Sequence, residues 1–149
     1  MKNLKAIRKI RAFNRYYTNV IGVVDRHILH SEYSLTEARI LYEIYNNSDF
    51  TVRKIKNILQ VDEGYLSRTI DKLIKQGLVI KKQSLMDRRV YNLSLSKRGE
   101  REFLKLNQKS EESVAEMMDH LSPDEVIQLV LIMDKISELL TKKGKDCGD

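Results

Sequence analysis

The stretch from Asp62 to Leu95 constrains the fold of this chain more than any other part of the sequence. Asp62 is a preferred helix N-cap, because its carboxylate can accept hydrogen bonds from backbone N–H groups of the first turn. Apolar residues then recur at helical spacing, at Leu66, Ile70, Leu73 and Ile74. Gly77 is suited to a left-handed C-cap. The sequence therefore predicts a short amphipathic helix that begins at Glu63 and stops at Gly77.

Two short strands joined by a basic turn are predicted to follow this helix. Residues 78–81 open with an apolar run, and residues 90–95 alternate in part between apolar and polar side chains. The turn between them contains Asp87, Arg88 and Arg89. A turn with two arginines behind an aspartate contributes little to an apolar core. Its composition indicates a contact with phosphate or with a nucleic-acid groove.

The charge of the chain is concentrated on this same region. The 149 residues are 42% hydrophobic, which fits one globular domain with a modest core, and the net charge of +6 favours an anionic partner. Residues 51–101 hold 13 basic and 5 acidic side chains, a net charge of +8, whereas residues 102–149 hold 6 basic and 11 acidic side chains, a net charge of −5. The anionic partner is therefore expected at residues 51–101, as nucleic acid or as a membrane surface.

The residues before Asp62 predict three further helices. An apolar repeat over residues 4–28 predicts one long amphipathic helix. Ser34 and Glu37 form a capping box for a second helix that ends near residues 46–47, and Thr51 caps a third, short helix. Only residues 60–61 separate this third helix from the helix at Asp62. Two short helices joined so closely, the second with a polar outer face, are typical of a helix-turn-helix.

Two helices are predicted after the strands. Ser96 caps a charged helix that we expect to extend to Leu121, and Ser122, Pro123 and Glu125 mark the start of another. This last helix is apolar around much of its circumference, so we expect it to form a dimer interface with the first helix. The predicted fold is mainly α with a small β-hairpin. It comprises a single domain over residues 1–149, in which residues 34–96 form a winged helix-turn-helix and residues 1–31 and 97–143 form dimerisation helices.

Five short motifs resemble the MarR family of winged helix-turn-helix transcription regulators over nearly the whole chain. They are LTEAR at 35–39, DEGYLSR at 62–68, GLV at 77–79, DRR at 87–89, and LSLS at 93–96 followed by Gly99. The resemblance implies a homodimer in which the helix at Asp62 enters the major groove and Arg88 and Arg89 reach the adjacent minor groove. The LTEAR and DEGYLSR motifs are most similar to those of a subgroup sometimes fused to an acetyltransferase. No glycine-rich acetyl-CoA loop is present, so acetyltransferase activity is not expected.

The expected function is that of a dimeric, sequence-specific transcription regulator that binds double-stranded DNA at an inverted repeat with half-sites about one helical turn apart. The resemblance favours a repressor relieved by a small aromatic effector. The candidate effector pocket comprises Tyr16, Tyr17 and Tyr42, although core packing explains these tyrosines equally well. The candidate DNA-binding residues are Thr51, Arg53, Glu63, Gly64, Ser67, Arg68, Lys72, Ser84, Asp87, Arg88 and Arg89.

Each of these features also has an ordinary structural explanation. Arg68 and Lys72 are compatible with a solvated helix face, and Asp87 with an arginine is compatible with a surface ion pair worth about 0–1 kcal/mol. Gly64 is equally compatible with a weak helix position and with a close approach of backbone to phosphate. The order of the motifs favours the DNA-binding interpretation both for Arg68 and Lys72 and for the arginines that follow Asp87.

A different class of function is a basic membrane-surface or protein-interaction module built on the first helix. Its basic run comprises Lys2, Lys5, Arg8, Lys9, Arg11 and Arg15. This alternative leaves the helix-turn-helix and the hairpin without a role. An enzyme is not expected, because no nucleophile, base and orienting group cluster in the sequence and no phosphate-binding loop is present.

Metal, disulfide and membrane-spanning features are not expected. His27 and His30 share a helix face, but a full ligand set is not evident even if Glu32 and His120 are considered, so we expect no metal and no cofactor. The lone Cys147 excludes an internal disulfide, and we expect no thiol switch. No apolar run is long enough to span a bilayer, and the protein is therefore expected to be cytoplasmic.

Overall fold

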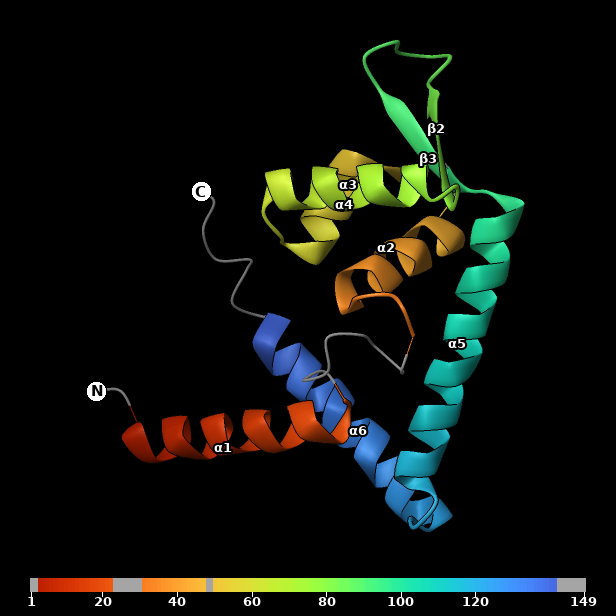
Figure 1. Ribbon diagram of the computed structural model, residues 1–149. Helices are drawn as coiled ribbons and strands as arrows, with labels where there is room; N and C mark the ends of the chain where they lie inside the picture. Colours follow the sequence, from red (N-terminus) through yellow and green to blue (C-terminus); the bar gives the residue numbers. More distant parts are fainter. Residues whose placement is uncertain (1–2, 23–30, 48–49, 142–149) are drawn as a thin grey trace. The chain divides into compact units, whose positions relative to one another are not determined.

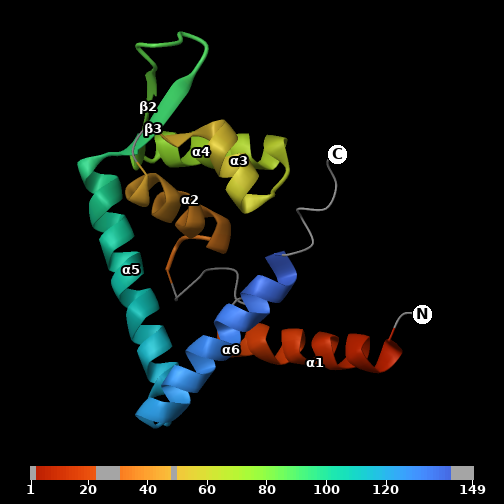
Figure 2. The ribbon, with the colours of Figure 1, turned by 180° about the vertical axis from the view of Figure 1, so that it is seen from behind.

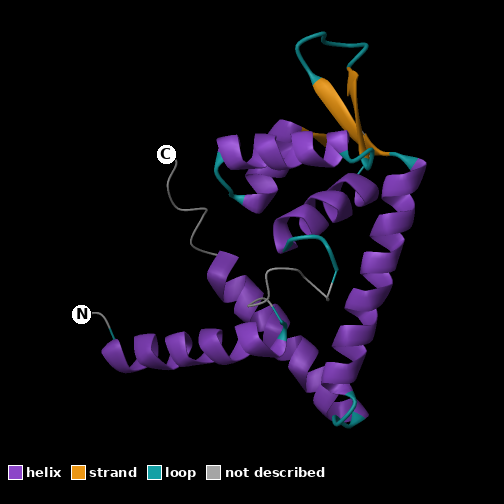
Figure 3. Ribbon diagram, viewed as in Figure 1, coloured by secondary structure: helices purple, strands orange, loops and turns teal. Residues whose placement is uncertain are grey.

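The computed structural model describes residues 3–22, 31–47 and 50–141. The chain divides into two compact units, Met1–Ser113 and Val114–Asp149, and each is described by itself. Over the described residues the chain forms helices α1 to α6 and a small antiparallel sheet (Figures 1 and 3). This confirms the predicted mainly α fold class.

Three helices of the first unit begin at the predicted capping residues. They are α2 (Leu35–Asn46), α3 (Val52–Leu59) and α4 (Glu63–Lys75). Ser34 and Glu37 form the complete capping box of α2, Thr51 Oγ1 accepts from the N–H of Lys54, and Asp62 Oδ1 accepts from the N–H of Tyr65. Because a cap is a local interaction over three residues, it was visible in the sequence.

The turn between α3 and α4 depends on one residue in the left-handed conformation. Gln60 has φ 51° and ψ 38°, and its N–H donates to the carbonyl of Lys56 at 2.9 Å. This geometry ends α3 and allows the chain to reach the cap of α4 within two residues. The short link predicted at residues 60–61 is therefore confirmed as the turn of a helix-turn-helix.

The sheet has one strand more than the predicted hairpin. Its strands β1 (Phe50–Thr51), β2 (Val79–Gln83) and β3 (Tyr91–Leu95) lie in the order β1-β3-β2, and both pairs are antiparallel. Phe50 pairs with Leu93, and both side chains are buried. The strand β1 was missed because two residues are too few to display an alternating pattern. The β2–β3 hairpin projects away from α3 and α4 in both views (Figures 1 and 2).

The core of the first unit lies between α2, α4 and the sheet. The completely or almost completely buried side chains are Ile40, Leu41, Ile55, Leu66, Leu73, Leu78 and Leu93. Three residues of the predicted α4 stripe are in this core, since Leu66, Ile70 and Leu73 are each at most 2% exposed. The helix α5 (Lys97–Met118) joins the core through Phe103, whose ring lies 4.4 Å from that of Tyr45 on α2. Residues of α4 opposite this stripe remain exposed.

The end of α4 and the start of α5 meet at the beginning of β2. The N–H of Leu78 donates to the carbonyl of Leu73, and that of Gly77, which has φ 71°, donates to the carbonyl of Ile74. These bonds form a Schellman motif, which confirms the predicted stop at Gly77. Gly99 lies so close to Leu78 that a Cβ at position 99 would be 2.0 Å from the Leu78 carbonyl oxygen. No other residue fits at position 99 without movement of the backbone.

The first helix is shorter than predicted. The helix α1 spans Leu4–Val20, and the chain turns at Ile21 and at Gly22, which has φ 66°. The apolar repeat continues beyond this point in the sequence, but glycine in the left-handed conformation ends the helix. The later part of the predicted helix lies at residues 23–30, outside the described residues. None of the described α1 side chains is buried.

The second unit contains the end of α5 and the helix α6 (Pro123–Thr141). The predicted start of α6 is confirmed, since Ser122 Oγ accepts from the N–H of Glu125 and the Glu125 carboxylate accepts from the N–H of Ser122. The helix α5 ends at Met118, three residues before the predicted end at Leu121, because the chain turns at residues 119–121. No side chain of α6 is buried, and no helix among the described residues is long and apolar enough to cross a membrane.

Candidate nucleic-acid interface

The helix α4 carries five of the eleven predicted contact residues in exposed positions. Ser67 and Arg68 lie one turn into the helix, opposite the buried stripe. Asp62 and Glu63 at the helix start are also exposed, and the Asp62 cap holds the first turn with a bond of 2.8 Å. The helix therefore presents a polar surface whose backbone is fixed at its N-terminal end.

Gly64 lies next to the Arg68 guanidinium group. A Cβ at position 64 would lie 3.3 Å from Arg68 Nη1 and 3.3 Å from Asp62 Oδ1. Both neighbours are flexible side-chain ends, so alanine would fit after a shift of a few tenths of an ångström. Glycine at this position leaves the arginine room to lie over the first turn of α4. It also leaves the backbone accessible to a phosphate.

The contact residues predicted on α3 and at its junction with α4 have different environments. Thr51 is half-buried and acts as the N-cap of α3, whereas Arg53 is exposed on its first turn. Glu63 forms an ion pair with Lys56, which links α3 to the start of α4. Thr51 and Glu63 therefore have a structural role within the helix-turn-helix, and the side chains of Arg53 and Glu63 are exposed to solvent.

The turn between β2 and β3 is held by side-chain oxygen atoms. Ser84 Oγ accepts from the N–H groups of Met86 and Asp87 at 3.2 and 3.4 Å, and the N–H of Ser84 donates to the carbonyl of Val90 at 2.8 Å. Asp87 Oδ1 accepts from the N–H of Arg89 at 2.9 Å. The predicted residues Ser84 and Asp87 thus shape the turn that carries the arginines.

The two arginines of this turn differ in what they contact. Arg89 Nε lies 3.4 Å from Asp87 Oδ1, while its side chain remains 92% exposed. In the described part of the chain, no hydrogen bond or ion pair engages the Arg88 guanidinium group, although the Arg88 carbonyl accepts from Gln83 Nε2. The turn therefore presents one guanidinium held by a carboxylate and one that is available to a phosphate.

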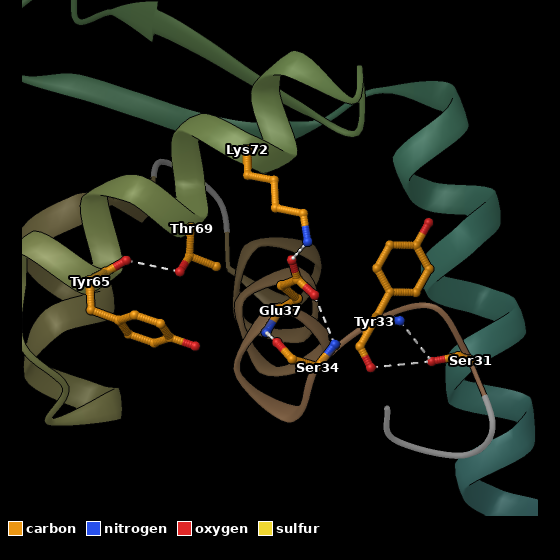
Figure 4. A network of polar contacts seen from close by, with 7 residues as sticks. All are labelled: Ser31, Tyr33, Ser34, Glu37, Tyr65, Thr69 and Lys72. Carbon is orange, nitrogen blue, oxygen red and sulfur yellow. Dashed lines mark hydrogen bonds and ion pairs between the residues drawn. The ribbon is translucent and has the colours of Figure 1, made fainter. Parts of the chain in front are cut away.

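Lys72 has a partner that the sequence did not reveal. Its ammonium Nζ lies 2.6 Å from Oε1 of Glu37 on α2, and the other carboxylate oxygen of Glu37 accepts from the N–H of Ser34 at 2.8 Å (Figure 4). The Glu37 side chain is 6% exposed and the Lys72 side chain 55% exposed. One carboxylate therefore caps α2 and binds α4. An ammonium group has three donors, so this contact does not exclude a phosphate contact by Lys72.

The Glu37–Lys72 contact also sets the protonation of both groups. Burial by itself would raise the pKa of Glu37, but the hydrogen bonds from Lys72 and Ser34 and the charge of Lys72 outweigh it, and the pKa is lowered. The hydrogen bond to Glu37 and the charge of that carboxylate raise the pKa of Lys72. Both groups are therefore charged at neutral pH.

Of the three tyrosines predicted for an effector pocket, Tyr42 lines a hollow between α2 and α5. Tyr42 on α2 and Phe103 on α5, whose ring centres are 6.1 Å apart, both line a hollow of about 250 Å³, and Arg39 is the one charged residue in its lining. Tyr16 and Tyr17 lie on α1, where the ring of Tyr17 stacks on Phe13 at 5.6 Å. Neither lines this hollow.

A second, larger hollow has a different character. It measures about 500 Å³ and is lined by the carboxylates of Glu32, Glu102 and Glu112 together with two lysines. At its wall Tyr33 is buried, and burial, followed by the charges of Glu102 and Glu32, raises the pKa of Tyr33 to about 12. Three carboxylates make this hollow unfavourable for an anionic ligand.

The predictions about metals and cysteine fall mainly on residues that are not described. His27, His30 and Cys147 lie outside the described residues. Among residues 3–22, 31–47 and 50–141, no three metal-binding side chains come close enough together to hold a metal ion. His120 lies in the turn between α5 and α6.

A helix-turn-helix combined with a three-stranded antiparallel sheet and a projecting hairpin defines a winged helix-turn-helix protein. Residues 33–91 match the model of the MarR family, which confirms the resemblance predicted from the sequence. The matched segment contains α2, α3, α4, β2 and the turn with both arginines.

The relatives with curated names are HTH-type transcriptional regulators. The HTH-type transcriptional regulator BilQ of Clostridium symbiosum (strain WAL-14163) is 27% identical over 95 residues, which are 64% of this chain and 65% of the relative. The chain thus spans slightly less than two thirds of BilQ. The uncharacterized HTH-type transcriptional regulator YkoM of Bacillus subtilis (strain 168) is 25% identical over 131 residues, 88% of this chain and 85% of YkoM.

Solved structures extend the likeness of fold to most of the chain. The crystal structure of Streptococcus pneumoniae FabT in complex with DNA superposes with a TM-score of 0.77, covers 92% of this chain and 98% of its own, and is 20% identical. At 20% sequence identity, this comparison shows that the two proteins share a fold.

Proposed function

We propose that this protein is a dimeric transcription regulator that binds double-stranded DNA in a sequence-specific manner. The observation that carries the proposal is the capped helix α4 with Ser67 and Arg68 exposed on its outer face. An arginine one turn into such a helix can bond guanine O6 and N7 in the major groove, and a serine can bond a base edge or the backbone. Asp62 and the Glu37–Lys72 contact fix the helix from both ends.

The β2–β3 hairpin supplies the second contact in this proposal. Arg88 and Arg89 sit on a turn whose backbone is held by Ser84 and Asp87. A narrow basic turn suits the negative potential of the minor groove, especially over A·T-rich flanks, and reads little of its degenerate base pattern. The two arginines of the hairpin therefore add affinity, while α4 adds sequence preference. The solved FabT complex contains DNA, which supports this partner for the shared fold.

Selection of DNA from a pool of random duplexes tests this proposal. Bound duplexes are recovered and sequenced over several rounds with the full chain. We expect an inverted repeat with half-sites about one helical turn apart, because a two-fold dimer presents its two α4 helices at that spacing. A pool that remains random, with binding that depends only on salt, would exclude a sequence-specific regulator.

The proposed homodimer rests on the apolar surfaces of α1 and α6. On α6 the exposed fractions of Ile127, Leu131, Leu139 and Leu140 are each 59% or more, and on α1 Leu4 and Ile10 are 66% and 60% exposed. Helices that expose this many large apolar side chains are typical of an oligomer interface. A chain truncated before Ser122 is expected to lose the dimer or to aggregate in size-exclusion chromatography. A soluble, DNA-binding monomer from that truncation would contradict the interface.

We further propose that the protein is a repressor released by a small aromatic acid, which binds in the Tyr42 hollow. The hollow combines two aromatic side chains with the guanidinium of Arg39, whereas the larger hollow is lined by three carboxylates. Of these two hollows, the first is therefore the one complementary to an aromatic anion. The test is release of the selected duplex by a panel of benzoates, with Arg39→Gln as the variant. Release that is unchanged in Arg39→Gln would exclude this site.

The alternative is a basic module that binds an anionic membrane surface or a protein through α1. It is supported by the exposed cations of α1 over residues 5–15. Flotation with vesicles of phosphatidylglycerol and phosphatidylcholine, beside competition by unlabelled duplex, separates the two classes. Flotation that the selected duplex does not inhibit would favour the module. We assign the protein no enzymatic activity and a cytoplasmic location, in keeping with a regulator.

A further inference from the structure

The most exposed apolar side chains of the described residues lie at the outer end of the β2–β3 hairpin. Leu85 is 102% exposed and Met86 97% exposed, whereas the exposed leucines and isoleucines of the helices retain at least a quarter of their surface in contact with the chain. Neither side chain stabilises the fold through packing. A pair of fully solvated apolar residues at the tip of a basic hairpin therefore requires another explanation.

Hydrogen bonds hold the backbone of the turn that carries these two side chains. Ser84 Oγ accepts from the N–H of Met86 itself, and the N–H of Ser84 closes the turn with the carbonyl of Val90. In the stem, the ammonium of Lys81 lies 4.9 Å from the centre of the Tyr91 ring. The backbone of the tip is thus ordered by polar contacts, and the apolar side chains remain directed to the exterior.

The surroundings of the tip identify the chemistry of its partner. Arg88 and Arg89 follow directly, and Lys81 and Lys82 lie on β2, so that the apolar tip is flanked by cations. A minor groove offers the complement, with phosphates along both rims and apolar sugar and base surfaces between them. Leucine and methionine are among the side chains that proteins insert between base steps in this groove.

On the basis of the proposed function, we propose that Leu85 and Met86 form an apolar wedge that enters the minor groove beside each half-site and unstacks one base step. The arginines then contact the phosphates on the rims. Flexible pyrimidine–purine steps such as TA are unstacked at the lowest cost, so the wedge would favour such a step at a position that no hydrogen bond reads. The two residues are specificity-determining in this sense, although they form no polar contact.

The experiment uses the full chain and a duplex recovered by selection, in which a fluorescent adenine analogue that is quenched by stacking replaces single adenines in the flanks. The wild type is expected to raise the fluorescence at one step in each flank. The variant Leu85→Ser with Met86→Ser is expected to bind about tenfold more weakly, to leave the fluorescence at the level of free DNA, and to keep the wild-type salt dependence, because no charge is removed.

The swapped variant Leu85→Met with Met86→Leu is the control, since it keeps an apolar tip, and it is expected to retain the fluorescence increase. If the wild type binds the duplex without any increase, or if the serine variant matches the wild type, the wedge is excluded and the proposed function stands. If selection recovers no duplex, the proposed function and the wedge both fail. If the serine variant loses flotation with phosphatidylglycerol vesicles but keeps DNA binding, the tip contacts lipid and the wedge is excluded.

Discussion

The ammonium of Lys72 on α4 lies 2.6 Å from the carboxylate of Glu37 on α2, and this contact joins the proposed recognition helix to the start of the helix that supports it. The two residues are 35 positions apart in the sequence. Because the same carboxylate also caps α2, the orientation of α4 depends on a group at the first turn of α2. The pair is the one ion pair among the described residues with a buried carboxylate.

The first prediction concerns the stability of this pair. Lys72→Met keeps the aliphatic part of the side chain but leaves the Glu37 carboxylate buried without its cation. We expect the free energy of unfolding to fall by about 1–2 kcal/mol, less than for a fully buried pair, because Lys72 is half exposed. Urea denaturation measures this loss. The control Lys75→Met removes an exposed lysine of the same helix and should change stability by less than about 0.5 kcal/mol. Equal losses in the two variants would contradict the role of the pair.

The second prediction concerns how the contribution of the Glu37–Lys72 pair to the free energy of unfolding depends on pH. The pKa of Glu37 is lowered in the folded protein, so its contribution is present above its ordinary pKa of 4.5 and is lost as the pH falls through the lower, folded pKa. The pKa of Lys72 is raised above 10.5, so its contribution is present below 10.5 and is lost as the pH rises through the folded pKa. The difference in unfolding free energy between wild type and Glu37→Gln should therefore shrink at both extremes. A difference independent of pH would contradict the prediction.

The third prediction concerns two glycines with different surroundings. Gly99→Ala places a Cβ 2.0 Å from the Leu78 carbonyl oxygen, so the start of α5 must move and we expect a loss of about 1–3 kcal/mol. Gly64→Ala is the matched control, because its Cβ meets only flexible side-chain ends and alanine favours a helix. Its stability should equal or exceed that of the wild type. Thermal unfolding of both variants tests the difference, and equal stability would contradict the tight contact at Gly99.

The local part of this structure could be predicted from the sequence, because it depends on residues a few positions apart. The caps at Ser34, Thr51 and Asp62 and the glycine stop at Gly77 are interactions within one turn of helix. The motif order then predicted a winged helix-turn-helix. The apolar run at residues 78–80 and the alternation at residues 90–95 likewise predicted the hairpin.

The features that were missed depend on contacts distant in the sequence or on a single backbone conformation. Glu37 was recognised as a cap, but its second oxygen binds Lys72 on another helix. The strand β1 owes its existence to pairing with β3, and its two residues carry no pattern of their own. The end of α1 is set by the left-handed Gly22, although the apolar repeat continues past it. None of these follows from periodicity.

The fourth prediction concerns the charges of the hairpin. Replacement of both Arg88 and Arg89 by alanine should weaken binding to the selected duplex and to a scrambled duplex by similar factors, because phosphate contacts carry no sequence information. The salt dependence should fall by about one or two counterions per subunit. Between the single variants, Arg88→Ala should have the larger effect, since Arg89 is held by Asp87. Lys109→Ala is the control for a charge outside the interface. A full wild-type salt slope in the double variant would contradict the role of the hairpin.

The central claim is that α4 reads sequence, and the ratio of affinities for the selected and scrambled duplexes at one salt concentration tests it most directly. The wild type should bind the selected duplex about a thousandfold or more tightly. Arg68→Ala should retain its affinity for scrambled DNA within a few fold and lose about 1–3 kcal/mol on the selected duplex, with a relaxed preference at one or two positions of each half-site. Equal affinity of the wild type for the two duplexes, or an unchanged ratio in Arg68→Ala, would contradict the assignment of α4 as the recognition helix.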